Sequence, residues 1–492
     1  MIISKSDYIK YYQCAKALWL YKNRKDYIPE DYEESRAGII ANGEAIEKQA
    51  YKLFPEGVWA SAEGFREGID QTARLVMDKT PVIFQASFWA SDLYCRSDII
   101  KHNPGGNTWD LYEIKSATSI KKEYLPDLAF QKVVLETAGL KVNKIRIIYV
   151  NRDYVRQGEI DPEKFLVMED VTGIINQKIS KVHFDIEDMS GLIKQKREPK
   201  VRIIKQCQDP YPCMFIDYCW QDIPKHSIYN VYFNTETIKK LLADKIVDLM
   251  DVPAGMIVRD KYARYHKALL EDKRHINKNE IQKELDQYQY PLYFLDYETN
   301  SPGVPMFDKY RPYQRIVFQY SLHVIEKSGG EIKHYEYLAD QPGDPCLGLA
   351  KTLSKQIGKA GSVIAWYKSF EAGCNREMGE RYPEYAEFFD DINGRLLDLM
   401  DFFAKGYYVD KNFYGSASLK KVMPVVAPHL TYEELNIQEG MEASNSWPIL
   451  IGGKLREGEK DELRSDMLAY CKLDTFAMVE IFRILDEIAC KN

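Results

Sequence analysis

The sequence predicts an α/β protein with two α/β domains joined by a helical segment. A chain of 492 residues is too long for a single hydrophobic core. Short β-rich runs alternate with helical patterns up to about residue 225, and the alternation resumes at "YPLYFLDYETN". Helical periodicity and charge dominate the stretch between them, as in "ETIKKLLADKIVDLM". The predicted domains are therefore 1–225, 226–287 as a helical connector, and 288–492.

The composition is that of an ordinary globular protein, with 45% hydrophobic and 29% charged residues. No stretch approaches the ~18 apolar residues that a membrane span needs, and "MIISKSDYIKYYQ" lacks the apolar core of a signal peptide. We therefore expect a cytoplasmic protein without a membrane partner, whose nine cysteines stay reduced. The net charge of −7 argues against a general nucleic-acid coat protein but is compatible with a local basic groove.

A β-hairpin in the first domain gathers the first set of candidate residues. "RSDII" and "WDLYEIKS" flank the Gly-containing turn "NPGGN", so the hairpin would bring Asp98 beside Glu113 and Lys115. Glu113 and Lys115 are two residues apart and share one face of a strand. Two carboxylates that hold Mg²⁺, with a lysine that positions or deprotonates water, suit the hydrolysis of a phosphodiester.

This arrangement resembles the PD-(D/E)XK nuclease core of RecB type. The helix "YLPDLAFQKVVLETAGL" follows the hairpin, and its Gln131 matches the family's glutamine, which contacts substrate or the lysine. The resemblance also implies a metal ligand on an upstream helix, "ANGEAIEKQAYKLFPEG", where Glu47 is favoured and Glu44 is the alternative. Leu135 stands where the family usually has a tyrosine, which is a departure from its pattern.

The run "CQDPYPCMFIDYC" places three cysteines at equal spacing, and reduced thiols in such a run favour metal binding over cross-linking. RecB-like nucleases of the AddB and CRISPR-adaptation types hold a [4Fe–4S] cluster with one cysteine before the core and three after it. That resemblance implies the ligands Cys14, Cys207, Cys213 and Cys219. Zinc is less favoured, because close C-x₂₋₄-C pairs are absent. The cluster would staple the two ends of the domain together.

The remaining cysteines show no ligand spacing, and we expect them to be core or surface residues. They are Cys95, Cys346, Cys374, Cys471 and Cys490.

A second set of acids lies in the C-terminal domain. "YFLDYETN" is an apolar strand with Asp296 and Glu298 on one face. "SVIAWYKSFEAGCNREM" predicts a strand followed by a helix that opens at Glu371. In "LAYCKLDTFAMVEIF", Tyr470 and Asp474 are four residues apart and share one helix face. Carboxylates of this kind can bridge two divalent ions.

The pattern resembles the DEDD exonucleases with an RNase H-like mixed-sheet fold, in their tyrosine-containing subclass. The resemblance implies that Asp296, Glu298, Glu371 and Asp474 bind Mg²⁺ or Mn²⁺, and that Tyr470 orients the attacking water. Glu371 replaces the usual aspartate, and Tyr367 replaces the asparagine that usually precedes it. Asp398, in "GRLLDLMDFF", suits an N-cap as well as a chemical role.

Together the two resemblances match a bacterial family that fuses a RecB-like nuclease to an RNase H-like exonuclease. They imply a hydrolase: a metal-dependent DNA nuclease and exonuclease with two catalytic centres, acting in DNA repair, processing or defence. Two alternatives stay open. An RNA-directed exonuclease would use the same carboxylates, and a nucleic-acid-binding adaptor would keep both folds without catalysis.

Overall fold

A computed structural model describes residues 2–30, 32–33, 36–60 and 64–490. The chain forms mixed β-sheets covered by helices, which confirms the predicted α/β class. It divides into two compact units. The first contains residues 1–222 and 302–314, and the second contains residues 223–301 and 315–492. The stretch 226–287, expected as a connector, lies in the second unit.

The first unit contains a seven-stranded sheet in the order β2-β3-β4-β5-β6-β7, with β1 paired to β4. Its strands are β1 (Ile3–Ser4), β2 (Val58–Trp59), β3 (Val82–Ala90), β4 (Leu93–Asn103), β5 (Thr108–Lys115), β6 (Val142–Val150) and β7 (Leu166–Asp170). Its helices are α1 (Lys5–Gln13), α2 (Ala15–Asn23), α3 (Ala37–Tyr51), α4 (Phe65–Met77), α5 (Tyr124–Thr137), α6 (Pro162–Phe165), α7 (Thr172–Asn176), α8 (Ile179–Ile193) and α9 (Ile216–Trp220). Strands β4 and β5 are antiparallel, whereas β5 and β6 are parallel and joined through α5.

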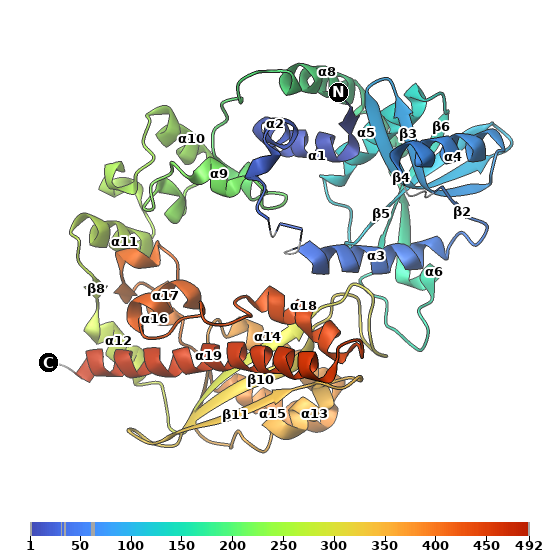
Figure 1. Ribbon diagram of the computed structural model, residues 1–492. Coiled ribbons are helices and arrows are strands. Elements are labelled where there is room, and N and C mark those ends of the chain that lie inside the picture. Colours follow the sequence, from blue (N-terminus) through green and yellow to red (C-terminus); the bar gives the residue numbers. More distant parts are fainter. Residues whose placement is uncertain (1, 31, 34–35, 61–63, 491–492) are drawn as a thin grey trace. The chain divides into compact units, whose positions relative to one another are not determined.

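Helices cover both faces of this sheet (Figure 1). Leu111 and Tyr112 are neighbours on β5, so their side chains point to opposite faces. Leu111 belongs to the cluster that contains Phe130 of α5, and Tyr112 belongs to the cluster that contains Ile46 of α3. Both faces of β5 are therefore buried, and the polar side chains at its end are held between packed helices.

Residues 302–314 separate β9 from β10 in sequence but pack within the first unit. The Arg156 guanidinium donates to the carbonyls of Pro305 at 2.8 Å and Met306 at 2.6 Å. The Gly303 amide donates to Asn42 Oδ1 of α3 at 2.7 Å. The sequence division assigned this segment to 288–492, because composition gives no sign of these distant contacts.

The second unit contains a five-stranded sheet in the order β11-β10-β9-β12-β13, with β9 at its centre. The strands are β9 (Leu292–Asn300), β10 (Ile316–Ile325), β11 (Ile332–Leu338), β12 (Ser362–Ala365) and β13 (Leu396–Asp398), and β8 (His275–Ile276) pairs separately with β14 (Tyr408–Val409). The helices are α10 (Thr235–Ala243), α11 (Asp260–Leu270), α12 (Lys278–Leu285), α13 (Cys346–Leu353), α14 (Ser369–Arg381), α15 (Ala386–Gly394), α16 (Asp401–Ala404), α17 (Leu419–Val426), α18 (Gly440–Ile451) and α19 (Glu457–Cys490).

The long helix α19 lies along this sheet (Figure 1). Phe482 of α19 packs edge-on against Phe294 of β9, on the face that also carries Asp296 and Glu298. Tyr297 points to the opposite face, where its hydroxyl donates to Asn375 of α14 at 2.9 Å. Helix α19 therefore brings its own polar side chains to the carboxylates of the central strand. Within the described residues, no helix combines the length and the apolar character needed to cross a bilayer.

Candidate metal centres

The hairpin of β4 and β5 brings Asp98 and Glu113 together, as the sequence predicts. Ile99 pairs with Tyr112, so Asp98 and Glu113 are each the next residue along the two strands. The amide of Ile114 donates to Asp98 Oδ2 at 2.8 Å. Lys115 Nζ lies 2.7 Å from Glu113 Oε1. The two-residue spacing therefore places the amine and the carboxylate on one strand face.

Helix α5 adds two polar side chains to this group. Gln131 Nε2 donates to Glu113 Oε2 at 2.7 Å, whereas the resemblance implies a contact with substrate or with the lysine. It also donates to Asp127 Oδ1 at 3.0 Å, and Asp127 Oδ2 accepts from Lys115 Nζ at 2.7 Å. The sequence analysis missed Asp127, although it precedes Gln131 by four residues and so lies on the same helix face.

Lys5 is a second lysine at this centre, and the sequence analysis missed it as well. A capping box of Ser4 and Asp7 begins α1 and places Lys5 in its first turn. Lys5 Nζ lies 2.7 Å from Glu113 Oε1, the oxygen that also accepts from Lys115. One carboxylate oxygen thus receives two ammonium groups.

These contacts shift the pKa values of the two acids in opposite directions. Burial of Asp98, together with the nearby charge of Glu113, raises its pKa from 3.8 to about 7. Burial alone would raise the pKa of Glu113, but the charges of Lys115 and Lys5 lower it below its usual value. Without a cation, Asp98 holds a proton near neutral pH while Glu113 is charged. A divalent ion can replace that proton.

Without divalent metal, the protein is expected to lose stability as pH rises from about 5 to 7.5. The folded state keeps the Asp98 proton that the unfolded chain releases, so unfolding is favoured by on the order of 3 kcal/mol across this interval. The lowered pKa of Glu113 affects stability only at pH values below this interval of 5 to 7.5. Urea unfolding in EDTA at both pH values measures the loss, and Asp98→Asn should reduce it. A stability that is constant or rises with pH would contradict this assignment.

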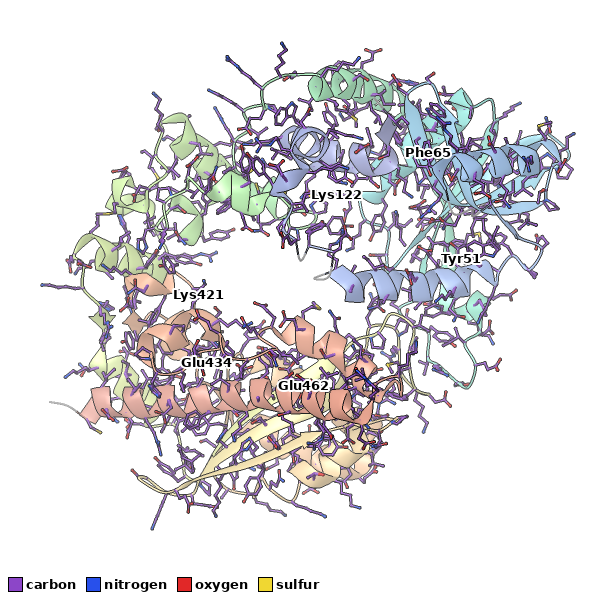
Figure 2. All side chains as sticks on the ribbon, viewed as in Figure 1. Tyr51, Phe65, Lys122, Lys421, Glu434 and Glu462 are labelled. Atoms are coloured by element: carbon purple, nitrogen blue, oxygen red, sulfur yellow. The ribbon has the colours of Figure 1, made fainter. Side chains whose placement is uncertain are left out.

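A cavity of about 570 Å³ opens beside this centre. Its lining includes Lys5, Asp98 and both candidate acids of α3, Glu47 and Glu44. Glu47 is half-buried and its pKa is raised by burial, whereas Glu44 is exposed. Tyr51, the last residue of α3 (labelled in Figure 2), donates to Glu47 Oε2 at 3.1 Å. The geometry thus favours Glu47, which is held in place, over Glu44.

The four predicted cysteine ligands lie around one small cavity of about 20 Å³. Cys14 lies between α1 and α2, and the other three lie between residues 207 and 219. The Gln13 side chain donates to the carbonyls of Gln206 at 3.0 Å and Tyr211 at 2.6 Å, which fixes one segment against the other. Burial and the neighbouring thiols raise the pKa of Cys213 to about 11.

Four thiols around one cavity form a complete donor set for a metal cluster. Tetrahedral zinc would draw the sulfurs to about 3.8 Å from one another, given Zn–S bonds of about 2.3 Å. Among the described residues, ligand atoms of three or more side chains converge within 4.8 Å only at Asp296, Glu298 and Cys471. The four thiols line one cavity, but no three of them lie that close together among the described residues.

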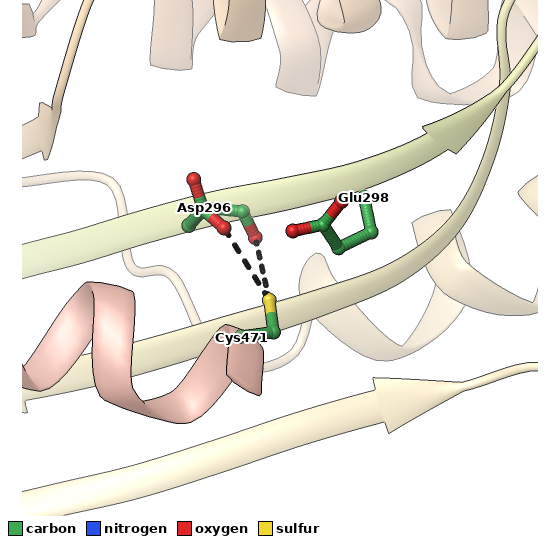
Figure 3. Close-up of side chains that lie close together, drawn as sticks. All are labelled: Asp296, Glu298 and Cys471. Carbon is green, nitrogen blue, oxygen red and sulfur yellow. Dashed lines mark hydrogen bonds between the residues drawn. The ribbon is translucent and has the colours of Figure 1, made fainter. Parts of the chain in front are cut away.

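In the second unit, Asp296 and Glu298 lie on the central strand β9 and face α19 (Figure 3). Cys471 Sγ of α19 lies 3.4 Å from Asp296 Oδ2. Cys471 was expected to be an ordinary core or surface residue. It is buried, but its sulfur reaches the carboxylates, and a search for cysteine-to-cysteine spacing could not reveal this. Its position beside Tyr470 was the signal available in the sequence.

Glu371 and Asp474 complete a cluster of four carboxylates, as predicted. Burial raises the pKa of Asp296 and the pKa of Glu371. The negative charge of Asp474 raises the pKa of Asp296 further. Burial also raises the pKa of Glu298, and the negative charges of Asp296, Asp474 and Glu371 raise it further. Burial raises the pKa of Asp474 to about 6. These shifts have one physical cause, which is negative charge gathered in a poorly solvated place.

Two tyrosines flank Asp474. The Tyr432 hydroxyl donates to Asp474 Oδ1, and the Tyr470 hydroxyl is also hydrogen-bonded to this carboxylate. The sequence predicted Tyr470 from its four-residue spacing to Asp474, whereas Tyr432 comes from a loop before α18 and carries no such signal. Lys420 of α17 lies 5.9 Å from the centre of the Tyr470 ring and lowers the pKa of Asp474. Asp474 is thus held in place by two tyrosine hydroxyls and lies near a lysine.

Asp398 has a structural role at the start of α14. Its Oδ1 accepts from the amide of Tyr367 at 2.9 Å, and its Oδ2 accepts from the amide of Lys368 at 3.0 Å. Tyr367 has a φ of 70°, the left-handed region that asparagine tolerates better than tyrosine. Asp398 is therefore not the N-cap of a helix, since the N-cap of α14 is Lys368 and that of α16 is Met400. Its carboxylate instead holds the turn before α14, the helix that carries Glu371.

Residues 293–418 match a family described as a domain of unknown function, DUF2779. This region contains Asp296, Glu298 and Glu371 but not Asp474. The chain is 26% identical over 223 residues to an uncharacterized protein of Ureaplasma parvum and 25% identical over 217 residues to one of Mycoplasma genitalium. Each match covers 40% of this chain and 32% of the relative, so the chain spans about a third of the length of the curated relatives it matches.

Proposed function

We propose that this protein is a metal-dependent nuclease that hydrolyses phosphodiester bonds at two centres. The observation that carries the proposal is the convergence of Asp296, Glu298, Glu371 and Asp474 from three distant segments. Like charges in a poorly solvated cluster are costly unless a cation neutralises them. Carboxylate groups are ligands that suit Mg²⁺ or Mn²⁺.

The second centre would then act as a DEDD exonuclease on an RNase H-like sheet. Bound divalent ions would supply the Lewis acidity that activates water and stabilises the leaving oxygen. Asp296 and Glu298, on the rigid central strand, would hold these ions, and Glu371 and Asp474 would complete the set. The Tyr470 hydroxyl, held by Asp474, would orient the attacking water. End-wise release of nucleotides is the activity that this arrangement suits.

The first centre supports a PD-(D/E)XK-type nuclease. Asp98, Glu113 and Glu47 would hold a divalent ion, while Gln131 and Asp127 fix Glu113 and Lys115 in position. Lys115 stays protonated, because its pKa is raised, against burial, by Asp127 and Glu113. It would therefore act by stabilising negative charge on the phosphate and by orienting water. DNA is the favoured substrate.

We propose an iron–sulfur cluster rather than zinc at the four-thiol site, because the sequence lacks the close C-x₂₋₄-C pairs that zinc sites usually have. The cluster would join Cys14 to the segment that ends at Cys219 and so hold α1 in place. Because α1 carries Lys5, the cluster would also position the second lysine of the first centre.

End-labelled DNA and RNA, incubated with the protein and Mg²⁺ or Mn²⁺, test the proposal. We expect cleavage that EDTA abolishes, with DNA preferred over RNA. Lys115→Ala should remove the activity of the first centre, about 100-fold or more, and leave end-wise trimming intact. Lys164→Ala, at an exposed lysine of α6, is the control and should change neither activity. Cleavage that is unaffected by both Lys115→Ala and Asp296→Asn would favour the adaptor alternative instead.

A further inference from the structure

The cysteine at the second centre gives that site a donor that Mg²⁺ does not use. One ligand atom each from Asp296, Glu298 and Cys471 lies within 4.8 Å of the other two (Figure 3). Cys471 Sγ approaches the carboxylate of Asp296 at 3.4 Å and its backbone carbonyl at 3.9 Å. Two oxygens and one sulfur thus converge on one point between β9 and α19.

The sulfur is fixed in this position by α19, the helix that packs against the strand of the other two ligands, β9. Cys471 is fully buried and lies three residues before Asp474, so both face β9. Strand β9 is the central strand of its sheet and is paired on both sides. The three donors therefore lie on rigid elements, which is the arrangement that a metal site requires.

A second observation, at Glu371, also favours a cation at this place. Glu371 is 2% exposed, and its Oε2 has no hydrogen-bond partner among the described residues. Glu371 lies near this cluster, because it and Asp296 interact electrostatically and its charge helps raise the pKa of Glu298. A buried carboxylate oxygen without a donor is costly, and a metal ion would satisfy it.

We propose that Asp296, Glu298 and Cys471 bind a thiophilic divalent cation of the Zn²⁺ class, in preference to Mg²⁺. Mg²⁺ takes oxygen ligands in an octahedron, whereas Zn²⁺ accepts sulfur and oxygen together in a tetrahedron. On binding, the Cys471 S–H bond breaks, its proton leaves to solvent and a Zn–S bond forms. This inference rests on the metal-binding acids of the proposed function and specifies which ion one position takes.

Zinc content of the full-length protein, measured after dialysis against excess Mg²⁺, tests the inference without any nucleic acid. The wild type should keep one Zn²⁺ per chain more than Cys471→Ser, whose affinity should fall by at least ~10–100-fold. Cys346→Ser, at another buried cysteine of the same unit, is the control and should match the wild type. The four thiols of the first unit contribute equally in all three proteins and cancel in the comparison.

Asp296→Asn gives an independent check, because it keeps the thiol and removes an oxygen ligand. It should also lose one Zn²⁺ per chain. Equal zinc in the wild type and Cys471→Ser, retention by Asp296→Asn, or an equal loss in Cys346→Ser would each overturn the inference. Loss of nuclease activity with zinc binding intact would count against the proposed function alone. Mg²⁺-dependent nuclease activity with no Cys471-dependent zinc would count against this inference alone.

Discussion

Asp296→Asn is expected to abolish end-wise trimming by the second centre and, at the same time, to stabilise the metal-free protein. The amide cannot hold a cation as the carboxylate does, so the rate should fall about 10³-fold or more. It also removes negative charge that faces Asp474 and Glu298. Relief of about 1 kcal/mol would raise the thermal midpoint by about 2–4 °C in EDTA.

A loss of activity together with a gain in stability distinguishes a metal-binding carboxylate from one that only stabilises the fold. An acid held by ordinary hydrogen bonds would destabilise the fold when replaced, because its donors would lose their partner. Asp461→Asn is the matched control, since Asp461 is an exposed aspartate of α19, the helix that packs against β9, and its replacement should change neither quantity. A lower midpoint in EDTA together with unchanged trimming would contradict the assignment of Asp296.

The parts of both centres that follow from local periodicity could be predicted from the sequence. Glu113 and Lys115 share a strand face because side chains alternate along a strand. Tyr470 and Asp474 share a helix face because four residues make about one turn. In both cases the distance along the chain fixes the distance in space, so the prediction needs only the type of element.

The parts that depend on packing between distant segments could not be predicted. Lys5 is 108 residues from Glu113, and Tyr432 is 42 residues from Asp474. No periodicity links residues so far apart, since the fold alone brings their elements together. Cys471 was missed for another reason: its partners are carboxylates, and the cysteine spacing says nothing about them. Residues 302–314 likewise join the first unit through backbone carbonyls, which carry no sequence signature.

Cys14→Ser is expected to remove the visible absorption of the purified protein and to destabilise the first unit. Cys14 is the one proposed ligand outside the segment 207–219, so its loss frees the N-terminal helices from that segment. A cross-link over so long a stretch of chain constrains the unfolded state strongly, and its removal should cost several kcal/mol, roughly 3–5. Iron content, absorbance and urea unfolding measure the effect.

The matched control is Cys95→Ala, at a fully buried cysteine of β4 that is outside the proposed ligand set. It should destabilise the core by leaving a small cavity but keep the iron and the colour. The comparison separates lost packing from a lost cluster, because only Cys14→Ser should change both stability and absorbance. Cys14→Ser should also weaken cleavage at the first centre, since α1 places Lys5 beside Glu113. Full iron content in Cys14→Ser would exclude Cys14 as a ligand. It would also contradict the proposal that the cluster positions Lys5.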